Sequence, residues 1–128
     1  MLLSGYIIHE AVVWSDVHNK WYFLPRRASS DTYDEVSDER RATNILFTSD
    51  ATFSDVSITR VGSLNQVRGY SAFRFVPGSG DRVAIALKTE EDRGRIASYI
   101  TVFNTNGKVL MPDMLVSDRF KFEGIEFV

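Results

Sequence analysis

The sequence contains no cysteine among its 128 residues. Disulfide bonds and thiolate metal sites are therefore excluded, while the redox compartment stays open. No Asn-x-Ser/Thr sequon is present either, so glycosylation gives no indication of location. The formal net charge is −2, without the excess of Lys and Arg that marks a nucleic-acid-binding domain.

Long apolar runs are also missing. No stretch approaches the ~20 residues that a membrane-spanning helix needs. The N-terminal stretch MLLSGYIIHEAVVW lacks a basic leading segment and is interrupted by His9 and Glu10, so it does not fit a signal peptide. We therefore expect no membrane segment here, and the compartment is not determined by these residues.

The chain is 44% hydrophobic, which is enough to form one packed domain. Its apolar residues show almost no helical periodicity. Aromatic and β-branched runs alternate instead with turn residues, which predicts an all-β, antiparallel fold. The predicted strands are Tyr6–Ser15, Lys20–Arg26, Thr43–Thr48, Val56–Gly62, Gly69–Val76, Arg82–Lys88, Ile96–Phe103, Lys108–Leu115 and Arg119–Val128.

Turn signals separate these strands. Asp16–Asn19, Pro77–Asp81 and Asn104–Gly107 fit short hairpin connections, and the last contains an Asn-Gly pair. Two longer connectors are charged, Ala28–Arg41 and Thr89–Arg95. We expect the carboxylates of the second connector to lie in a turn.

One short pattern occurs three times, as HEAVVW, YSAFRF and FEGIEF. In each copy a ring residue precedes Glu or Ser, and an apolar residue and an aromatic follow at intervals of two, on one strand face. The oxygen-bearing residues are Glu10, Ser71 and Glu123, spaced 61 and 52 residues apart. Each interval contains four predicted strands, which is one blade of a propeller.

If each copy is the innermost strand of a blade, Glu10, Ser71 and Glu123 face a shared central channel. Carboxylate and hydroxyl oxygens are ligands that calcium accepts. Spacing alone favours the alternative, in which the two glutamates are solvated strand-edge carboxylates and Ser71 is filler, because a glutamate on a strand is usually solvated. His9 and Glu10 do not form a zinc motif, because residue 13 is Val13 and the segment is a strand.

Six stretches of this sequence resemble the soluble calcium-activated nucleotidases, also called calcium-dependent apyrases. They are HEAVVWSD, KWYFLPRRAS, SDERRATNILF, GYSAFRF, IALKTEEDRGRIASYI and FKFEGIEFV, and the resemblance runs from Gly5 to Val128. It implies a partial five-bladed β-propeller. The chain would be the C-terminal portion, with blades at residues 5–62 and 69–115 and a closing strand at 119–128.

The resemblance also implies an activity, the calcium-dependent hydrolysis of nucleoside di- and triphosphates such as UDP and GDP. Family members place one oxygen-bearing residue per blade on an axial Ca²⁺, and Glu10, Ser71 and Glu123 match three of those positions. The family suggests a secreted or ER/Golgi-lumenal location, and a homodimer is possible. We expect the isolated segment to be inactive, and the base that activates water is not assigned.

Phosphate binding needs positive groups on the non-bridging oxygens. Arg26 and Arg27 end the second predicted strand, at the mouth that Glu10 faces, and Lys88 occupies the matching place in the next blade. Arg26 is favoured, because Pro25 fixes the backbone before it; the alternative is a solvated or loop-paired arginine. No P-loop, GxSxG or Ser-His-Asp pattern is present.

The rival hypothesis is a non-enzyme: a calcium-binding or protein-interaction β-domain that pairs its exposed sheet edges with a partner. Further blade-coding sequence upstream of Met1 would favour the nucleotidase, and a stable 128-residue monomer would favour the rival.

Overall fold

The computed structural model describes residues 6–29, 43–65, 67–120 and 124–127, with side chains from Ala11 to Arg26 and from Thr43 onward. This part of the chain is all-β and contains no helix. Its strands are β1 Tyr6–Ser15, β2 Lys20–Ser29, β3 Ile45–Ser49, β4 Val56–Arg60, β5 Arg68–Phe75, β6 Val83–Asp92, β7 Arg95–Asn104 and β8 Val109–Ser117.

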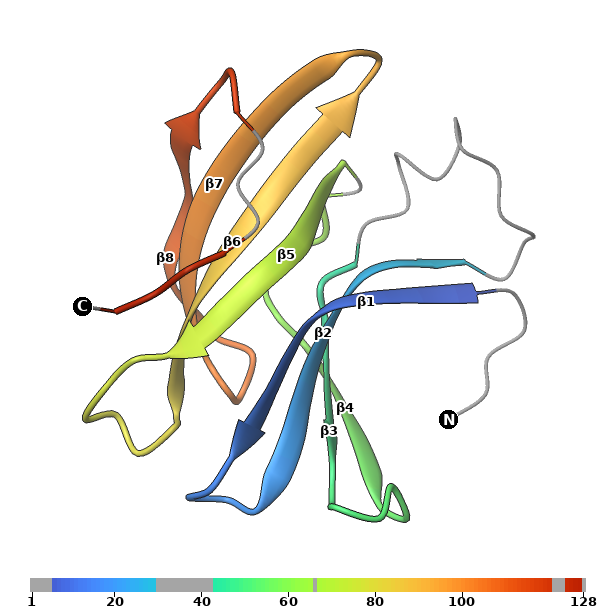
Figure 1. The fold of residues 1–128 in the computed structure, drawn as a ribbon, viewed down its shortest axis with the longest axis vertical. Helices are drawn as coiled ribbons and strands as arrows, with labels where there is room; N and C mark the ends of the chain where they lie inside the picture. Colours follow the sequence, from blue (N-terminus) through green and yellow to red (C-terminus); the bar gives the residue numbers. More distant parts are fainter. Residues whose placement is uncertain (1–5, 30–42, 66, 121–123, 128) are drawn as a thin grey trace.

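The strands form two four-stranded antiparallel sheets, in the orders β1-β2-β3-β4 and β5-β6-β7-β8 (Figure 1). Each strand pairs with the next in sequence, and short turns join β1 to β2, β6 to β7 and β7 to β8, whereas β2 and β3 are joined by a longer connector. The predicted antiparallel pairing and the four strands per unit are confirmed. The assignment of these sheets to propeller blades stays a prediction.

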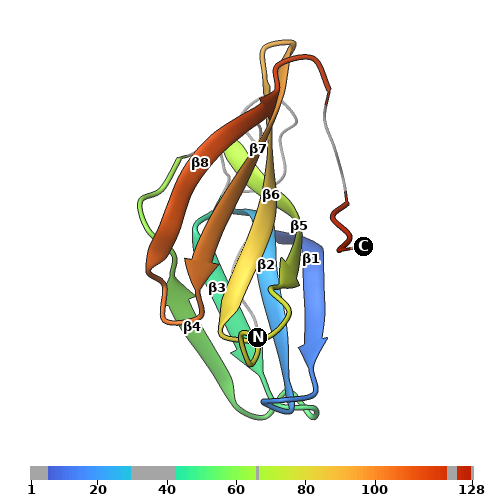
Figure 2. The same cartoon turned by 90° about the vertical axis from the view of Figure 1, so that its left-hand side faces the viewer.

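The sheets meet through their first strands. β5 contacts β1 and β2. Figure 2 shows β1, β5 and the C-terminal segment on one side of the molecule and β4 and β8 on the other. The shared core between the sheets consists of Ala11, Tyr22, Leu24, Leu46, Val61, Tyr70, Phe73, Ala84, Ala86 and Phe103. The first strand of each sheet is therefore an inner strand.

Aromatic packing gives the two faces of the first sheet different neighbours. The Tyr22 ring meets Phe75 edge-on with centroids 5.0 Å apart, and Phe73 is buried beside them. Trp14 and Trp21 alternate with core residues along β1 and β2, so they lie on the opposite face. There they pack on each other at 5.2 Å, outside the core shared by the two sheets.

The prediction of a connector at residues 89–95 is wrong. β6 and β7 continue through it, and Asp92 pairs with Arg95 across a two-residue turn. Arg93 and Gly94 both have positive φ, 53° and 83°. This is the geometry of a type I′ turn, whose twist matches that of the flanking strands. The carboxylate of Glu90 consequently belongs to a strand and not to a turn.

The strand expected at residues 119–128 is only partly within the described residues. Its described parts, 119–120 and 124–127, contain no strand. Arg74 of β5 instead donates hydrogen bonds to the Ile125 carbonyl at 3.1 Å and to the Glu126 carboxylate at 3.0 Å. These are side-chain contacts, whereas a strand requires a backbone ladder. Residues 121–123 and 128 lie outside the described part.

The first long connector starts later than expected. β2 extends to Ser29 and pairs with β1 as far as Tyr6. Residues 28 and 29 are therefore strand residues, and residues 30–42 lie outside the described part.

Candidate functional site

A β-bulge lies at Ser71. Across β5 and β6, Tyr70 pairs with Lys88 and Ala72 pairs with Leu87, so Ser71 is an extra residue without a partner in the register. A bulge bends its strand and re-aims the side chain of the extra residue. Bulges are common beside binding sites for this reason.

The same irregularity occurs in the first sheet. His9 pairs with Pro25 and Ala11 pairs with Leu24, which leaves Glu10 as the extra residue of β1. The oxygen-bearing residue of the sequence repeat therefore occupies the bulge of the inner strand in both sheets. The sequence repeat therefore coincides with a β-bulge at the same place in β1 and β5.

Arg26 lies at a second irregularity, on the other strand of that pair. Ile8 pairs with Arg27 and His9 with Pro25, so Arg26 is the extra residue of β2. Its side chain is buried, with 5% of its surface exposed. Its backbone carbonyl accepts a hydrogen bond of 3.3 Å from the amide of Thr43.

A hollow of about 450 Å³ opens where β1, β5 and the C-terminal segment meet. Its lining is Ala11, Val12, Ser71, Ala72, Phe73, Arg74, Gly124, Ile125 and Glu126. The backbone thus brings Ser71 together with the residues that follow Glu10 and Glu123. The Glu10 side chain and all of Glu123 are outside the described part, so their roles as ligands stay predictions.

Ser71 is suited to a polar role in this hollow. Only 4% of its surface is exposed. Its hydroxyl donates a hydrogen bond of 3.4 Å to the carbonyl of Leu87, across the bulge. A serine hydroxyl has one proton and two lone pairs, and its oxygen is one of the ligand atoms that calcium accepts.

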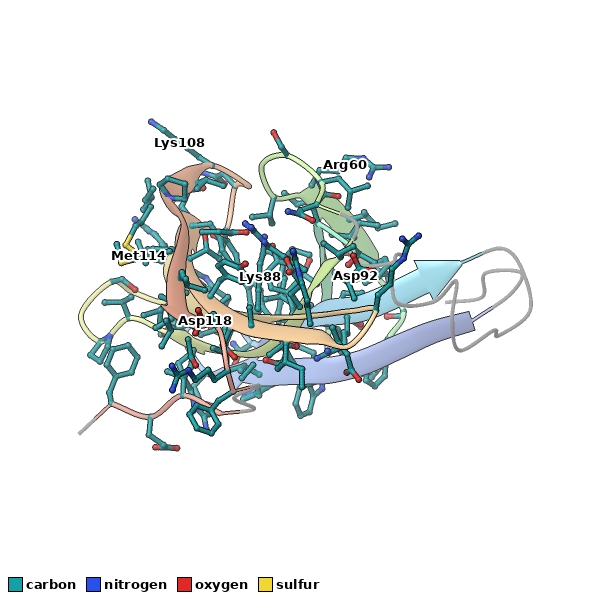
Figure 3. All side chains as sticks on the ribbon, turned by 90° about the horizontal axis from the view of Figure 1, so that it is seen from above. Arg60, Lys88, Asp92, Lys108, Met114 and Asp118 are labelled. Carbon is teal, nitrogen blue, oxygen red and sulfur yellow. The ribbon has the colours of Figure 1, made fainter. Side chains whose placement is uncertain are left out.

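Lys88 lies in a different place from the one expected. It pairs with Tyr70 as Pro25 pairs with His9, so it is the counterpart of Pro25 and not of Arg26. Its ammonium lies 3.2 Å from an oxygen of Asp113 and 5.0 Å from the centre of the Tyr70 ring. Figure 3 shows Lys88 in the middle of the molecule, seen from above.

Lys88 also lines a second hollow of about 530 Å³, bounded by residues 61–65 of the connection between β4 and β5. Ser71 is not among the residues of this hollow. Lys88 pairs across the strands with Tyr70 and shares its face of the sheet, whereas Ser71 is the next residue along β5, so the two side chains point to opposite faces. The role of Lys88 in phosphate binding stays a prediction.

Sequence reasoning missed a charged network on the face of the second sheet that carries Lys88. The guanidinium of Arg68 contacts Glu90 and Asp113, both at 3.4 Å. It also stacks over the Tyr99 ring, 3.8 Å from its centre. Glu90 further pairs with Arg95 at 3.3 Å. The members come from all four strands of the sheet, so no local pattern in the sequence connects them.

The same network affects the buried phenol of Tyr70. Burial, and secondarily the charge of Asp113, raise the pKa of Tyr70 above its ordinary value of 10.0. The phenol is therefore neutral at physiological pH. Its oxygen is buried and has no hydrogen-bond partner among the described residues.

Among the residues whose side chains are described, no group of three or more His, Asp or Glu is arranged to hold a metal ion. The predicted calcium ligands are only partly within that set, since it includes Ser71 and neither glutamate. The described ranges contain no helix that is long and apolar enough to cross a membrane.

The fold defines a class: two antiparallel meander sheets, joined through inner strands that each carry a bulge beside a common hollow. Comparison with known families then identifies the group within that class. The Apyrase family matches residues 1–128, and the chain belongs to that family. The resemblance found in the sequence is thereby confirmed.

Curated relatives of this chain support the same family assignment. The chain is 45% identical over 124 residues to soluble calcium-activated nucleotidase 1 of Mus musculus, covering 97% of this chain and 30% of the relative. It is 46% identical over 125 residues to apyrase apy-1 of Caenorhabditis elegans, covering 96% and 35%. An apyrase of Cimex lectularius is 40% identical over 125 residues, covering 97% and 34%. The chain spans about a third of the length of these relatives.

Proposed function

We propose that this chain forms part of a calcium-dependent nucleotidase that hydrolyses nucleoside di- and triphosphates. One observation carries the proposal. Bulges at Glu10 and Ser71 lie on the two inner strands, which line one hollow together with residues 124–126. Support comes from the relatives, which are named as apyrases and calcium-activated nucleotidases.

Glu10, Ser71 and Glu123 would hold the calcium ion. Carboxylates and a hydroxyl are hard oxygen donors, the set that Ca²⁺ takes in 6–8-fold coordination. Ser71 fits this role because it lines the hollow from a bulge and carries a hydroxyl oxygen, an atom that calcium accepts as a ligand. When bound, calcium supplies positive charge to the phosphate oxygens and a binding site for water.

Arg26 is the proposed contact to the substrate's phosphate oxygens. It follows Pro25 on β2, opposite the bulge at Glu10, and it is buried, which strengthens a charge interaction relative to one in water. Arg27 is the weaker candidate beside it. Lys88 is the weakest of the three candidates. Its ammonium is paired with Asp113, and the residue lines the second hollow and not the one that contains Ser71.

In the proposed reaction a water oxygen bonds to the terminal phosphorus while the bond from that phosphorus to the bridging oxygen breaks. The products are inorganic phosphate and a nucleotide shorter by one phosphate. Arginine side chains neutralise the charge that develops on the phosphoryl oxygens. The positively charged groups therefore act by positioning and electrostatics.

The proposal extends to the protein that contains the segment. Because the chain spans about a third of its relatives, we propose that further sheets complete a five-bladed propeller. Residues 1–128 alone would then have no measurable activity, since only part of the ligand set is present. A secreted or lumenal location and a homodimer are proposed from the family resemblance.

The test uses a full-length protein carrying this segment, assayed for phosphate release from UDP and GDP. Ser71→Ala should raise the calcium concentration for half-maximal activity at least ~10-fold, since even residues that only orient a ligand cost that much. Ser57→Ala, at an exposed serine of β4, is the matched control and should change nothing. Unchanged calcium dependence in both variants would contradict the proposed site.

One observation favours the rival function, an interaction domain. Four apolar side chains of the edge strand β8 are exposed: Leu110, Met114, Leu115 and Val116. An exposed apolar edge is suited to pairing with a partner. Calcium binding by the full-length protein without any phosphate release would favour this second function.

A further inference from the structure

The turn between β7 and β8 presents an asparagine followed by a glycine. Asn106 is exposed at its tip. The side-chain oxygen of Asn104 accepts hydrogen bonds from the amides of Asn106 and Lys108, both at 3.0 Å. The amide of Gly107 donates a hydrogen bond of 3.0 Å to the carbonyl of Asn104. Asn104 thus holds the turn closed from two sides.

Packing requires glycine at position 107. Gly107 has a φ of +95°, and a Cβ atom there would overlap the carbonyl of Arg60 at the end of β4 in the other sheet. Its own carbonyl accepts a hydrogen bond of 3.1 Å from the amide of Gly62. Gly107 is therefore a contact between the two sheets. Figure 3 shows Arg60 and Lys108 at the same outer edge of the molecule.

We propose that Asn106 is a site of spontaneous deamidation, a modification separate from the proposed nucleotidase activity. The Gly107 backbone nitrogen forms a bond to the Asn106 side-chain carbonyl carbon. The bond from that carbon to the amide nitrogen breaks, and ammonia leaves with the proton that the backbone nitrogen loses. Water then opens the cyclic imide at either carbonyl, giving aspartate or isoaspartate.

Two features of the chain make this position reactive. Glycine has no Cβ, so its nitrogen is the least hindered backbone nucleophile. Asparagine is among the thermally labile residues, and here it is solvent-exposed. Because the contact with Arg60 excludes any other residue at 107, the labile pair is built into the sheet-to-sheet packing.

The fold also controls the rate. In the closed turn the Gly107 amide is occupied as a donor to Asn104, so attack requires the turn to open. Removing the Asn104 side chain removes two of the hydrogen bonds that close the turn. Asn104→Ala is therefore expected to accelerate deamidation at Asn106.

The two products differ in their effect on the structure. Aspartate keeps the normal backbone, whereas isoaspartate inserts an additional methylene group into the backbone immediately before Gly107. That insertion displaces the carbonyl bonded to Gly62 and the backbone packed against Arg60. Isoaspartate at 106 should loosen the contact between the sheets, and aspartate should not.

The experiment is to incubate the full 128-residue chain at mildly alkaline pH and to follow each asparagine by peptide mass spectrometry. Deamidation adds about one mass unit as the amide becomes a carboxyl group. Asn19 is the matched control, since it is exposed in a turn but is followed by Lys20. We expect conversion at Asn106 at least about tenfold faster, because glycine removes the steric barrier.

Three further arms complete the test. Asn106→Gln should abolish the gain in mass in that peptide, and Asn104→Ala should increase its rate. An isoaspartyl-specific carboxyl methyltransferase should label the aged chain but not Asn106→Asp, and the labelled fraction should unfold at lower urea concentration than Asn106→Asp. Equal rates at Asn106 and Asn19, or no acceleration in Asn104→Ala, would overturn the proposal.

Discussion

Ser15, at the end of β1, donates a hydrogen bond of 2.8 Å to the carboxylate of Asp81, in the turn between β5 and β6 of the other sheet. The Ser15 hydroxyl also accepts a hydrogen bond of 3.1 Å from the amide of His18. Ser15 is fully buried. One hydroxyl therefore closes a hairpin in the first sheet and joins it to the second.

Ser15→Ala should lower the free energy of unfolding by about 2 kcal/mol, because it leaves the Asp81 carboxylate and the partly buried His18 amide without this partner. Urea unfolding of the 128-residue chain measures this, with the slope m expected to be unchanged. Ser57→Ala at the exposed site of β4 is the control. Equal stability of the two variants would mean that the hydroxyl does not join the sheets.

The turn that follows β3 depends on the carboxylate of Asp50. Hydrogen bonds from the hydroxyl and amide of Ser54 lower the pKa of Asp50 below its ordinary value of 3.8. A depressed pKa means that the stabilisation is present above the unfolded-state pKa and is lost as the pH falls through the folded-state pKa. The Ser54 amide resonance, followed by NMR, should therefore shift below pH 3.8 and not around it.

Asp50→Asn retains an acceptor oxygen but not the charge, so the acid-dependent shift at Ser54 should vanish in that variant. A midpoint at 3.8 or above in the unmodified chain would contradict the prediction.

The buried phenol of Tyr70 is a cost in the folded state. Within the described part of the chain its oxygen has no partner, and an unpaired buried polar group costs about 1–3 kcal/mol. Tyr70→Phe keeps the ring and its contact with Phe103, so it should raise the free energy of unfolding by about 1 kcal/mol. Urea unfolding tests this, with Tyr99→Phe at the half-buried ring under Arg68 as a neutral control.

The same substitution should change the alkaline limb of the stability profile. Because burial raises the pKa of Tyr70, the unfolded chain ionises above its pKa of 10.0 while the folded chain stays neutral. The free energy of unfolding therefore falls as the pH rises above 10. Tyr70→Phe should show a smaller loss. An identical alkaline loss in both proteins would show that Tyr70 is not its source.

The strands were predictable where the apolar and polar residues alternate. β1 begins and ends at the predicted residues, since a pattern of period two is local. The charged run from Glu90 to Asp92 was predicted as a turn because Arg68, the cross-strand partner of Glu90, is distant in the sequence. Glu90 is paired with Arg68 on the neighbouring strand, and such a partner gives no signal in a local window.

The candidate site was also predictable from the sequence only in part. The repeat found Glu10 and Ser71 because equivalent bulges recur at equivalent places in the two sheets. The environment of Lys88 was not predictable, because it depends on Asp113, 25 residues away on β8. A repeat in the sequence identifies equivalent backbone positions, whereas the contacts of a side chain depend on residues that the repeat does not contain.

The buried pair of Lys88 and Asp113 gives the last prediction. Their side chains are 8% and 17% exposed, so neither charge is well solvated. Asp113→Asn leaves the ammonium buried without a counter-charge and should cost about 3 kcal/mol of unfolding free energy. Lys88→Met alone should cost less, because Asp113 retains its contact with Arg68.

Combining Lys88→Met with Asp113→Asn removes both charges, so the double variant should be more stable than Asp113→Asn alone. The coupling energy from the double-mutant cycle should be about 1–3 kcal/mol, as for residues in direct contact. Urea unfolding of the four proteins measures it. Strictly additive losses would show that the two charges do not stabilise each other, and Lys88 would then regain weight as a free phosphate contact.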